Sequence, residues 1–214
     1  AETQETLIRD ALLINTNVLY CDNITLSTGA VASTPTSPAL MEASTTVMCL
    51  LTPDMVAKAV TKMKKDKVKT INGKFYAVIH PSVAYDLRKS KEWIEAHKYA
   101  ATSEIFNGEI GEMHGCRFIE NTFAPILGGE DYKNKAGTMT YATYFFGKDA
   151  FGIIDPEGGA LEMIVKDKSQ VGGPLNQFST VGYKFETNGA TVLYTERVLR
   201  VMSCSTFSGT DEEN

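Results

Sequence analysis

The chain has 214 residues, of which 43% are hydrophobic and 22% charged, so it can bury a core and has the composition of a typical globular protein. Its 21 basic and 26 acidic residues give a net charge of −5, which excludes tight binding of nucleic acid by the surface as a whole and leaves only a local patch for it. No apolar run approaches the length of about 20 residues that a membrane-spanning helix needs. The four cysteines lie far apart without a CxxC pair, which is typical of reduced, buried thiols rather than of disulfides or a zinc site.

The first 51 residues predict the end of a helix followed by a hairpin. Apolar residues recur at helical spacing over 5–14. The chain begins without a methionine or a signal sequence, so we expect a fragment or a processed product that enters this helix part-way. Segments 18–21 and 45–51 have strand composition, and a Ser-, Thr-, Ala- and Pro-rich loop lies between them. We therefore expect one long hairpin over 18–51.

A helix start is the clearest signal in the next segment. Thr52 can cap the helix, Pro53 suits its first position, and Asp54 lies at the positive end of its dipole. The predicted buried stripe consists of Met55, Val56, Ala59, Val60 and Met63. The helix is expected to end in five lysines, at 62, 64, 65, 67 and 69. Cations are favoured at this end of a helix in any case, and a basic patch for nucleic acid or an acidic partner is the alternative.

A buried strand is predicted at 75–79, followed by a turn into two helical segments, 82–90 and a second one around Trp93. His80 lies at the strand-to-helix junction, where catalytic residues often occur. Because it precedes Pro81, a capping or packing role is favoured over catalysis.

Glycines at 108, 111 and 115 predict turns that lead into a strand at 116–121, with Glu109, Glu112, His114 and Cys116 crowded around them. Cys116 with His114 or His80 is the only candidate nucleophile and base, and a cysteine hydrolase is kept as a remote alternative. The histidines and Cys116 lack metal-ligand spacing, and no phosphate-binding loop is present. We therefore predict no catalytic, metal or cofactor site. Acids in such a turn are more often solvated, or paired with Arg or Lys.

The last third predicts strands and hairpins. Segments 138–146, 151–155 and 161–166 predict a β-meander with a tight turn at 156–159. Asn188-Gly189 is a strong hairpin signal and predicts that 178–185 pairs with 190–193. A final strand is expected within 196–203, and the acidic tail 204–214 is expected to be disordered.

The sequence resembles the major capsid proteins of tailed bacteriophages, in the N-four-like group of coat proteins. The resemblance covers most of 50–203 in the same order, and it rests on FYAVIHPSVAYDL (75–87), WIEAHKY (93–99), GEIGEMHGCRFIEN (108–121), YATYFFGKD (141–149), GYK (182–184) and ERVLRV (196–201). It implies an α+β chain with the fold shared by tailed-phage and herpesvirus coats, built of mixed sheets and hairpins.

The resemblance also implies a division of the chain. Segment 1–51 corresponds to the end of a spine helix and a peripheral-domain hairpin, and 52–150 to an axial-type domain. Segment 151–203 corresponds to meander and hairpin strands that return to the peripheral domain, and 204–214 to the acidic tail. Family members carry an extended arm, a projecting loop and the start of the spine helix, for which little corresponds here, so we expect an N-terminally truncated form.

The implied function is structural: self-assembly into hexamers and pentamers of an icosahedral shell around phage DNA. The expected partners are copies of the chain, with scaffolding and portal proteins as further candidates and only weak contact with packaged DNA. No membrane partner is expected. The implied location is the virion, and the host cytoplasm during assembly. An encapsulin-type or prophage-derived compartment shell is the alternative. The candidate interface or turn residues are Gly108, Glu109, Gly111, Glu112, Arg117, Lys148 and Arg197.

Overall fold

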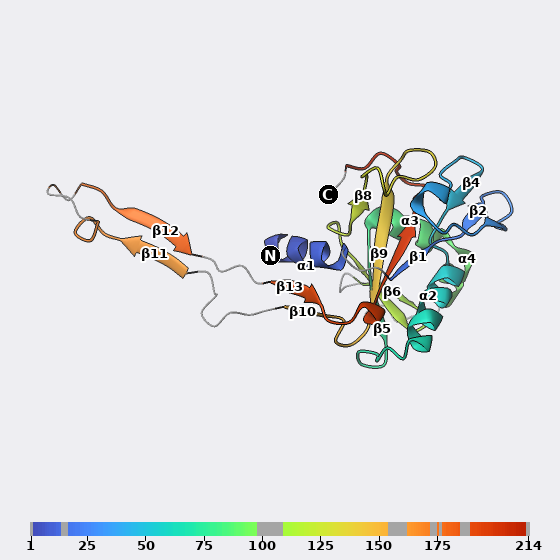
Figure 1. Ribbon diagram of the computed structural model, residues 1–214, viewed down its shortest axis with the longest axis horizontal. Coiled ribbons are helices and arrows are strands. Elements are labelled where there is room, and N and C mark those ends of the chain that lie inside the picture. The colour runs from blue at the N-terminus through green and yellow to red at the C-terminus, as the bar shows by residue number, and fades with distance from the viewer. Residues whose placement is uncertain are drawn as a thin grey trace.

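The structure, a computed structural model, describes residues 2–13, 17–97, 109–153, 162–171, 175, 177–184 and 189–212. Its elements in chain order are α1 (Glu2–Leu13), β1 (Val18–Tyr20), β2 (Asn23–Thr25), β3 (Val31–Ser33), η1 (Pro38–Leu40), β4 (Val47–Cys49), α2 (Pro53–Lys65), β5 (Phe75–Ile79), α3 (Pro81–Lys89), α4 (Lys91–His97), β6 (Glu109–Met113), β7 (Cys116–Glu120), β8 (Ile126–Leu127), β9 (Thr140–Phe146), β10 (Phe151–Ile153), β11 (Glu162–Lys166), β12 (Thr180–Lys184), β13 (Ala190–Val192), η3 (Thr195–Arg197) and β14 (Val198–Ser203). Figure 1 shows a body built on one sheet and a ribbon of β11 and β12 that lies away from it. Among the described residues, no helix is both long and apolar enough to cross a membrane.

The body is organised on a mixed seven-stranded sheet with the order β1-β14-β9-β5-β7-β6, and β8 pairs with β9 beside this path. β1 runs parallel to β14 and β5 parallel to β7, while the other neighbours are antiparallel. The central strands β9 and β14 are buried along almost their whole lengths, and β9 accordingly lacks a regular alternation of polar and apolar residues. The strands of this sheet come from the segments 1–51, 52–150 and 151–203 alike.

Helices cover both faces of this sheet. On one face, Trp93 of α4 meets Phe118 of β7, whose ring meets Phe145 of β9 edge to face. On the other face, Ile8 of α1 and Tyr144 of β9 line a common cavity. Neighbouring residues of a strand point to opposite faces, so Tyr144 and Phe145 lie on different faces of the sheet. α1 therefore covers the face of Tyr144, and α4 covers the face of Phe145. Figure 1 accordingly shows α1 on one side of the sheet and α2 and α4 on the other.

The helix predicted after Thr52 is present as α2 and begins as the sequence indicates. The Thr52 hydroxyl accepts a hydrogen bond from the Met55 amide at 3.4 Å, and Pro53 occupies the first turn. All five positions of the predicted buried stripe are buried. The helix ends at Lys65, and Lys67 adopts a left-handed backbone conformation with φ of 56°.

The single long hairpin predicted for 18–51 is wrong. β1 joins the main sheet beside β14, so strands from opposite ends of the chain are neighbours. β4 pairs with β2, and β3 pairs with β2 as well, which forms a separate three-stranded sheet. The composition indicated strands at both ends of 18–51 correctly, but strands of three residues carry too little pattern to specify a partner.

The strand pairings predicted for the last third are also wrong. β10 pairs with β13 rather than with β11, and β12 pairs with β11 rather than with β13. The two pairs are therefore nested, which makes one long ribbon instead of a meander followed by a hairpin. The turn expected at 156–159 and Asn188 lie outside the described residues.

The glycine-rich stretch contains a strand where we expected turns. β6 begins at Glu109, whose backbone pairs with Ile119, and it joins β7 through a tight turn at His114 and Gly115. Both turn residues have positive φ, so Gly115 is the turn device that the sequence predicted. Gly111, with φ of 144°, lies instead at an irregularity of register within β6. Gly108 lies outside the described residues.

Gly147 follows β9 at a point of close backbone approach. A Cβ atom at this position would lie 2.5 Å from the carbonyl oxygen of Lys69 and 2.5 Å from Cγ1 of Val68. We expect Gly147→Ala to lower the free energy of unfolding by about 1–3 kcal/mol, because backbone has to move to admit the methyl group. Gly182→Ala is the matched control, since nothing lies within 4 Å of its added Cβ, and we expect it to change stability by less than about 0.5 kcal/mol. Urea unfolding of both variants tests this, and equal effects would contradict it.

Residues 204–212 are attached to the body, which corrects the prediction of a disordered tail for this part. The Asp211 carboxylate accepts hydrogen bonds from the Tyr141 hydroxyl at 2.6 Å and the Ser82 hydroxyl at 2.9 Å. The Asp86 carboxylate accepts one from the Thr206 amide at 2.8 Å. The acidic composition suggested a solvated tail, but its polar groups find partners on α3 and β9.

The attachment of the tail is expected to weaken in acid. Desolvation raises the pKa of Asp211, but hydrogen bonds from Ser208, Tyr141 and Ser82 outweigh it and hold the pKa below its ordinary value of 3.8. A carboxyl whose pKa is lowered on folding stabilises the fold above the unfolded-state pKa, and this contribution is lost as the pH falls through the folded-state pKa. We therefore expect Asp211→Asn to cost on the order of 1 kcal/mol at neutral pH and progressively less below about pH 4.

Urea unfolding as a function of pH measures this difference. Glu212→Gln is the control, because Glu212 is an exposed acid in the same segment. The same pH dependence in both variants would contradict a role for Asp211.

Burial lowers the pKa of His80, partly offset by Asp211 and Glu120, so its protonation also destabilises the fold in acid. That effect begins below its ordinary pKa of 6.5, at a higher pH than the one expected for Asp211.

Candidate subunit interface

An apolar stripe lies exposed on the ribbon of β11 and β12. All ten residues of the two strands are exposed. Their register places Met163 opposite Tyr183 and Val165 opposite Val181. Residues that are opposite across a ribbon, or two apart along a strand, share a face, so these four form one surface, which we call the ribbon stripe. Their exposed fractions are 69% for Met163, 81% for Tyr183, 55% for Val165 and 66% for Val181.

The opposite face of the ribbon is mostly polar. Glu162 lies opposite Lys184 and Lys166 opposite Thr180, with Ile164 opposite glycine between them. The ribbon is therefore amphipathic, although it has no core of its own among the described residues. A two-stranded hairpin is at best marginally stable in water, and a contiguous exposed apolar surface marks an interaction site. These properties mark the ribbon stripe as a candidate interaction surface.

Several of the residues predicted as interface positions lie at one end of the main sheet. Lys148 follows β9 and Arg197 precedes β14, and the register joins these ends through Phe146 and Val198. β5 and β7 reach the same end, where Arg117 lies one residue past the start of β7. The strand pairings thus bring together residues that are far apart in the sequence.

Two of the predicted interface residues, Glu112 and Arg197, are held in ion pairs within the chain. Glu112 pairs with Lys74, and the Arg197 guanidinium lies 3.2 Å from the Asp149 carboxylate and 3.9 Å from the centre of the Tyr194 ring. Glu112 therefore has a lysine partner, which is one of the two arrangements that the sequence favoured for acids in this stretch. The role of these residues in contacts between subunits stays a prediction.

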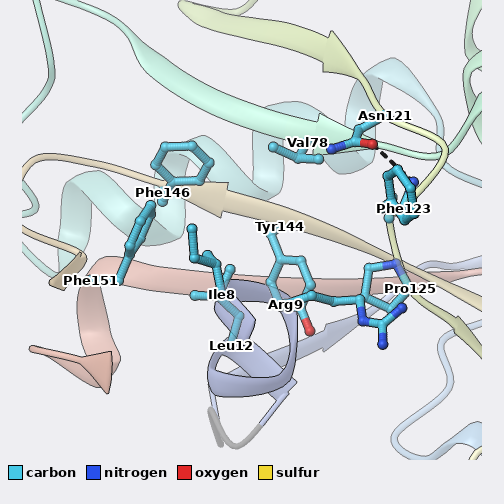
Figure 2. Close-up of a pocket in the computed structure, with 11 residues that line it drawn as sticks. Ile8, Arg9, Leu12, Val78, Asn121, Phe123, Pro125, Tyr144, Phe146 and Phe151 are labelled. Carbon is cyan, nitrogen blue, oxygen red and sulfur yellow. Dashed lines mark hydrogen bonds between the residues drawn. The ribbon is translucent and has the colours of Figure 1, made fainter. Parts of the chain in front are cut away.

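A second apolar feature lies where α1 crosses the sheet. A cavity here has a volume of about 180 Å³. Figure 2 shows its lining residues, which are Ile8, Arg9, Leu12, Val78, Asn121, Phe123, Ala124, Pro125, Tyr144, Phe146 and Phe151. Two of its polar groups have structural roles: the Asn121 side chain accepts a hydrogen bond from the Phe123 amide at 2.9 Å, and Arg9 pairs with Asp10 at 3.1 Å. Burial raises the pKa of Tyr144 to about 12, which Arg200 opposes, so its hydroxyl stays protonated. Most of the lining residues are apolar.

The cysteine-hydrolase alternative fails on geometry. The parallel register places Cys116 opposite Phe75, whereas His80 follows the other end of β5, roughly 16 Å away at the rise of a strand. His114 lies exposed in the turn before the buried Cys116. Burial, and to a smaller extent Glu112, raises the pKa of the Cys116 thiol, which therefore stays protonated. All four cysteines are buried and free, as predicted.

His80 has the capping role that the sequence favoured. Its Nδ1 atom accepts a hydrogen bond from the Ser82 amide at 3.2 Å at the start of α3. Among the described residues, no group of three or more His, Cys, Asp or Glu side chains is arranged to hold a metal ion.

The ribbon stripe is the part of the candidate site that the sequence did not identify. The signal was present as the alternating pairs Met163 and Val165, and Val181 and Tyr183. Alternation predicts a half-buried strand, but it does not tell whether the covering surface lies in the same chain. Only the pairing of β11 with β12, away from the body, shows that the apolar face is left open.

The fold is similar to that of phage capsid proteins. The structure is similar to the capsid of Ralstonia phage GP4, with a TM-score of 0.59 and 13% sequence identity over 99% of this chain and 65% of that one. The acid-stable capsid of Helicobacter pylori bacteriophage KHP30 gives a TM-score of 0.57 at 13% identity, over 94% of this chain and 65% of that one. A chain from Mycobacterium phage Che8 gives 0.52 at 18% identity, over 94% of this chain and 57% of that one.

These likenesses confirm the α+β capsid fold that the sequence predicted. No protein-family model and no curated protein matches the sequence. The narrower N-four-like assignment therefore stays a prediction. The chain spans about three fifths of the length of the capsid chains it matches.

Proposed function

We propose that the protein is a structural coat subunit that associates with copies of itself into a virion shell. The ribbon stripe carries this proposal, because it is an apolar surface that the described chain leaves uncovered on a fold that phages use for capsids. Contacts between copies related by rotation close into rings when each ribbon reaches the next subunit. Hexamers and pentamers of an icosahedral shell are the assemblies of this kind that we propose.

The remaining assignments follow from this proposal. The seven-stranded sheet with α2, α3 and α4 corresponds to the axial-type part, and α1 to the end of a spine helix. The shell encloses phage DNA, scaffolding and portal proteins are further partners, and the subunit passes from the host cytoplasm into the virion. The protein acts by shape and contact, with no catalytic step.

The test is the assembly state of the purified chain. Sedimentation velocity over a concentration series, with negative-stain electron microscopy of the same samples, is expected to show oligomers that grow with concentration into rings or shells. A monomer at every concentration and salt tested would overturn the proposal. A compartment shell of the same fold is distinguished by its contents, since only a virion shell encloses nucleic acid.

A further inference from the structure

Six lysines gather at the end of α2 and beside it. Lys62, Lys64 and Lys65 lie in the last turn of the helix, and Lys67 and Lys69 follow in the loop toward β5. Lys148, after β9, joins them because its backbone amide donates a hydrogen bond to the Lys69 carbonyl at 2.8 Å. We call this set the lysine rim. Two acids lie in these segments, Asp66 and Asp149, and Asp149 is neutralised by its ion pair with Arg197. The six lysines and Asp66 therefore have a formal charge of 6 − 1 = +5, in a chain whose net charge is −5.

The fold holds the lysine rim in place. Lys67 has a left-handed backbone with φ of 56°, and its amide donates to the Lys64 carbonyl at 3.0 Å. The next residue, Val68, is buried, and its amide donates to the Met63 carbonyl at 3.0 Å. Gly147 packs closely against this loop, as the contacts of its would-be Cβ show. Figure 1 shows α2 ending beside the loop that leads into β5. Five of the six lysines are exposed, and Lys62 is partly exposed.

The ammonium groups of the lysine rim have no hydrogen-bond or ion-pair partner among the described residues, unlike several other lysines of the body. Lys58 lies 2.6 Å from Asp22 and 2.9 Å from Asp54, and Lys135 lies 2.5 Å from Glu42. The chain therefore neutralises isolated lysines locally but leaves this cluster open. A fixed, uncompensated positive surface on an acidic protein attracts a polyanion, and its field is local because salt screens it within about 10 Å.

The composition of the lysine rim indicates which polyanion fits. The charges of the set are all lysines, which act as point charges that suit phosphates in any orientation, while Arg197 at the same end of the sheet is held by Asp149. Among the described residues, no large hydrophobic side chain from 41 to 84 is exposed, so the surface lacks the apolar anchors on which protein interfaces depend. The same segment has no exposed aromatic ring for stacking unpaired bases, and the half-exposed Tyr194 ring at this end of the sheet is covered on one face by the Arg197 guanidinium.

We propose that the lysine rim binds the phosphate backbone of duplex DNA without reading its sequence, an inference that rests on the shell function above and locates the contact with enclosed DNA. The contact is purely electrostatic, so it is weak and reversible at physiological salt. The acidic remainder of the surface confines DNA to this end of the sheet, near Phe151, where β10 begins, and Val192, where β13 ends.

The test compares two triple variants with equal charge change. Lys64→Gln, Lys65→Gln and Lys67→Gln remove half of the lysine rim, and the control replaces Lys91, Lys133 and Lys135 by glutamine elsewhere on the body. Fluorescence anisotropy of a labelled duplex of random sequence is measured over a series of salt concentrations. Each phosphate contact contributes about 0.9 to the slope of log K against log salt, so we expect the rim variant to lose about 2–3 in slope and the control to keep it.

No binding of duplex DNA at low salt would overturn the proposal, and so would equal losses in the two variants. Tighter binding of polyglutamate than of DNA would show that the partner is an acidic protein instead. Sedimentation velocity separates this inference from the shell function: the rim variant is expected to associate like the unmodified chain. A chain that binds DNA through the lysine rim but stays monomeric would contradict the shell function alone.

Discussion

Replacing Phe118 by alanine is expected to lower the free energy of unfolding by about 3–5 kcal/mol. Phe118 is fully buried at the middle of β7, where its ring meets Trp93 with centroids 5.7 Å apart and Phe145 with centroids 6.0 Å apart, both edge to face. The substitution removes the central ring of this row and leaves a cavity between α4 and the sheet, which the rigid strands on either side cannot close. Such a loss is a large part of the 5–15 kcal/mol that typically holds a domain together.

Ile119→Ala on the same strand is the matched control. Ile119 points to the opposite face and is 36% exposed, so we expect a loss below about 1 kcal/mol. Phe118→Leu keeps most of the side-chain volume, so its loss in free energy of unfolding is expected to lie between those of Phe118→Ala and Ile119→Ala. This variant gives a measurable unfolding transition if the alanine variant is largely unfolded. Urea unfolding followed by tryptophan fluorescence, which reports on Trp93 itself, measures all three. Similar losses at 118 and 119 would show that the row of rings is not a stabilising element of the core.

Local signals in the sequence identified individual elements well. Thr52 and Pro53 marked the start of α2, and His80 before proline marked the start of α3, because caps act within one turn of the helix. The continuous apolar run at 75–79 marked a buried strand for the same local reason. Each of these signals is complete within a few residues, so no knowledge of the rest of the fold was needed.

Strand partners could not be predicted in the same way. β1 and β14 pair although they lie at opposite ends of the chain, and nothing in either short strand specifies the other. Asn188-Gly189 strongly favours a tight hairpin, yet β12 and β13 on its two sides pair with β11 and β10. The nested pairing joins β11 to β12 over five residue pairs and β10 to β13 over three, and a turn signal of two residues does not specify it.

The candidate site follows the same division. Glu112 and Arg117 were identified from their surroundings in the sequence, but their position at one end of the sheet with Lys148 and Arg197 depends on strand register. The lysine rim was visible as five lysines near a helix end, whereas Lys148 joins it only through the hydrogen bond to Lys69. Local charge is readable from sequence, and its grouping across strands is a property of the fold.

The double substitution Met163→Lys and Tyr183→Glu is expected to weaken self-association by at least ~30-fold, the equivalent of one interface hot spot of about 2 kcal/mol. The two residues lie opposite each other on the ribbon stripe, so the new charges have opposite signs across the strands and do not repel each other. Desolvating them in an interface is costly, while the ribbon itself remains paired. Because all residues of β11 and β12 are exposed, the free energy of unfolding of the body is expected to be unchanged.

The control exchanges the neighbouring pair on the polar face, Glu162→Lys with Lys184→Glu, which preserves net charge and cross-strand attraction. We expect this exchange to leave association within about threefold, since charges at an interface rim contribute little. Sedimentation velocity over a concentration series measures both variants beside the unmodified chain. If the stripe variant associates as the unmodified chain does, the ribbon does not make the contact between subunits. If both variants fail equally, general charge rather than the apolar stripe controls assembly.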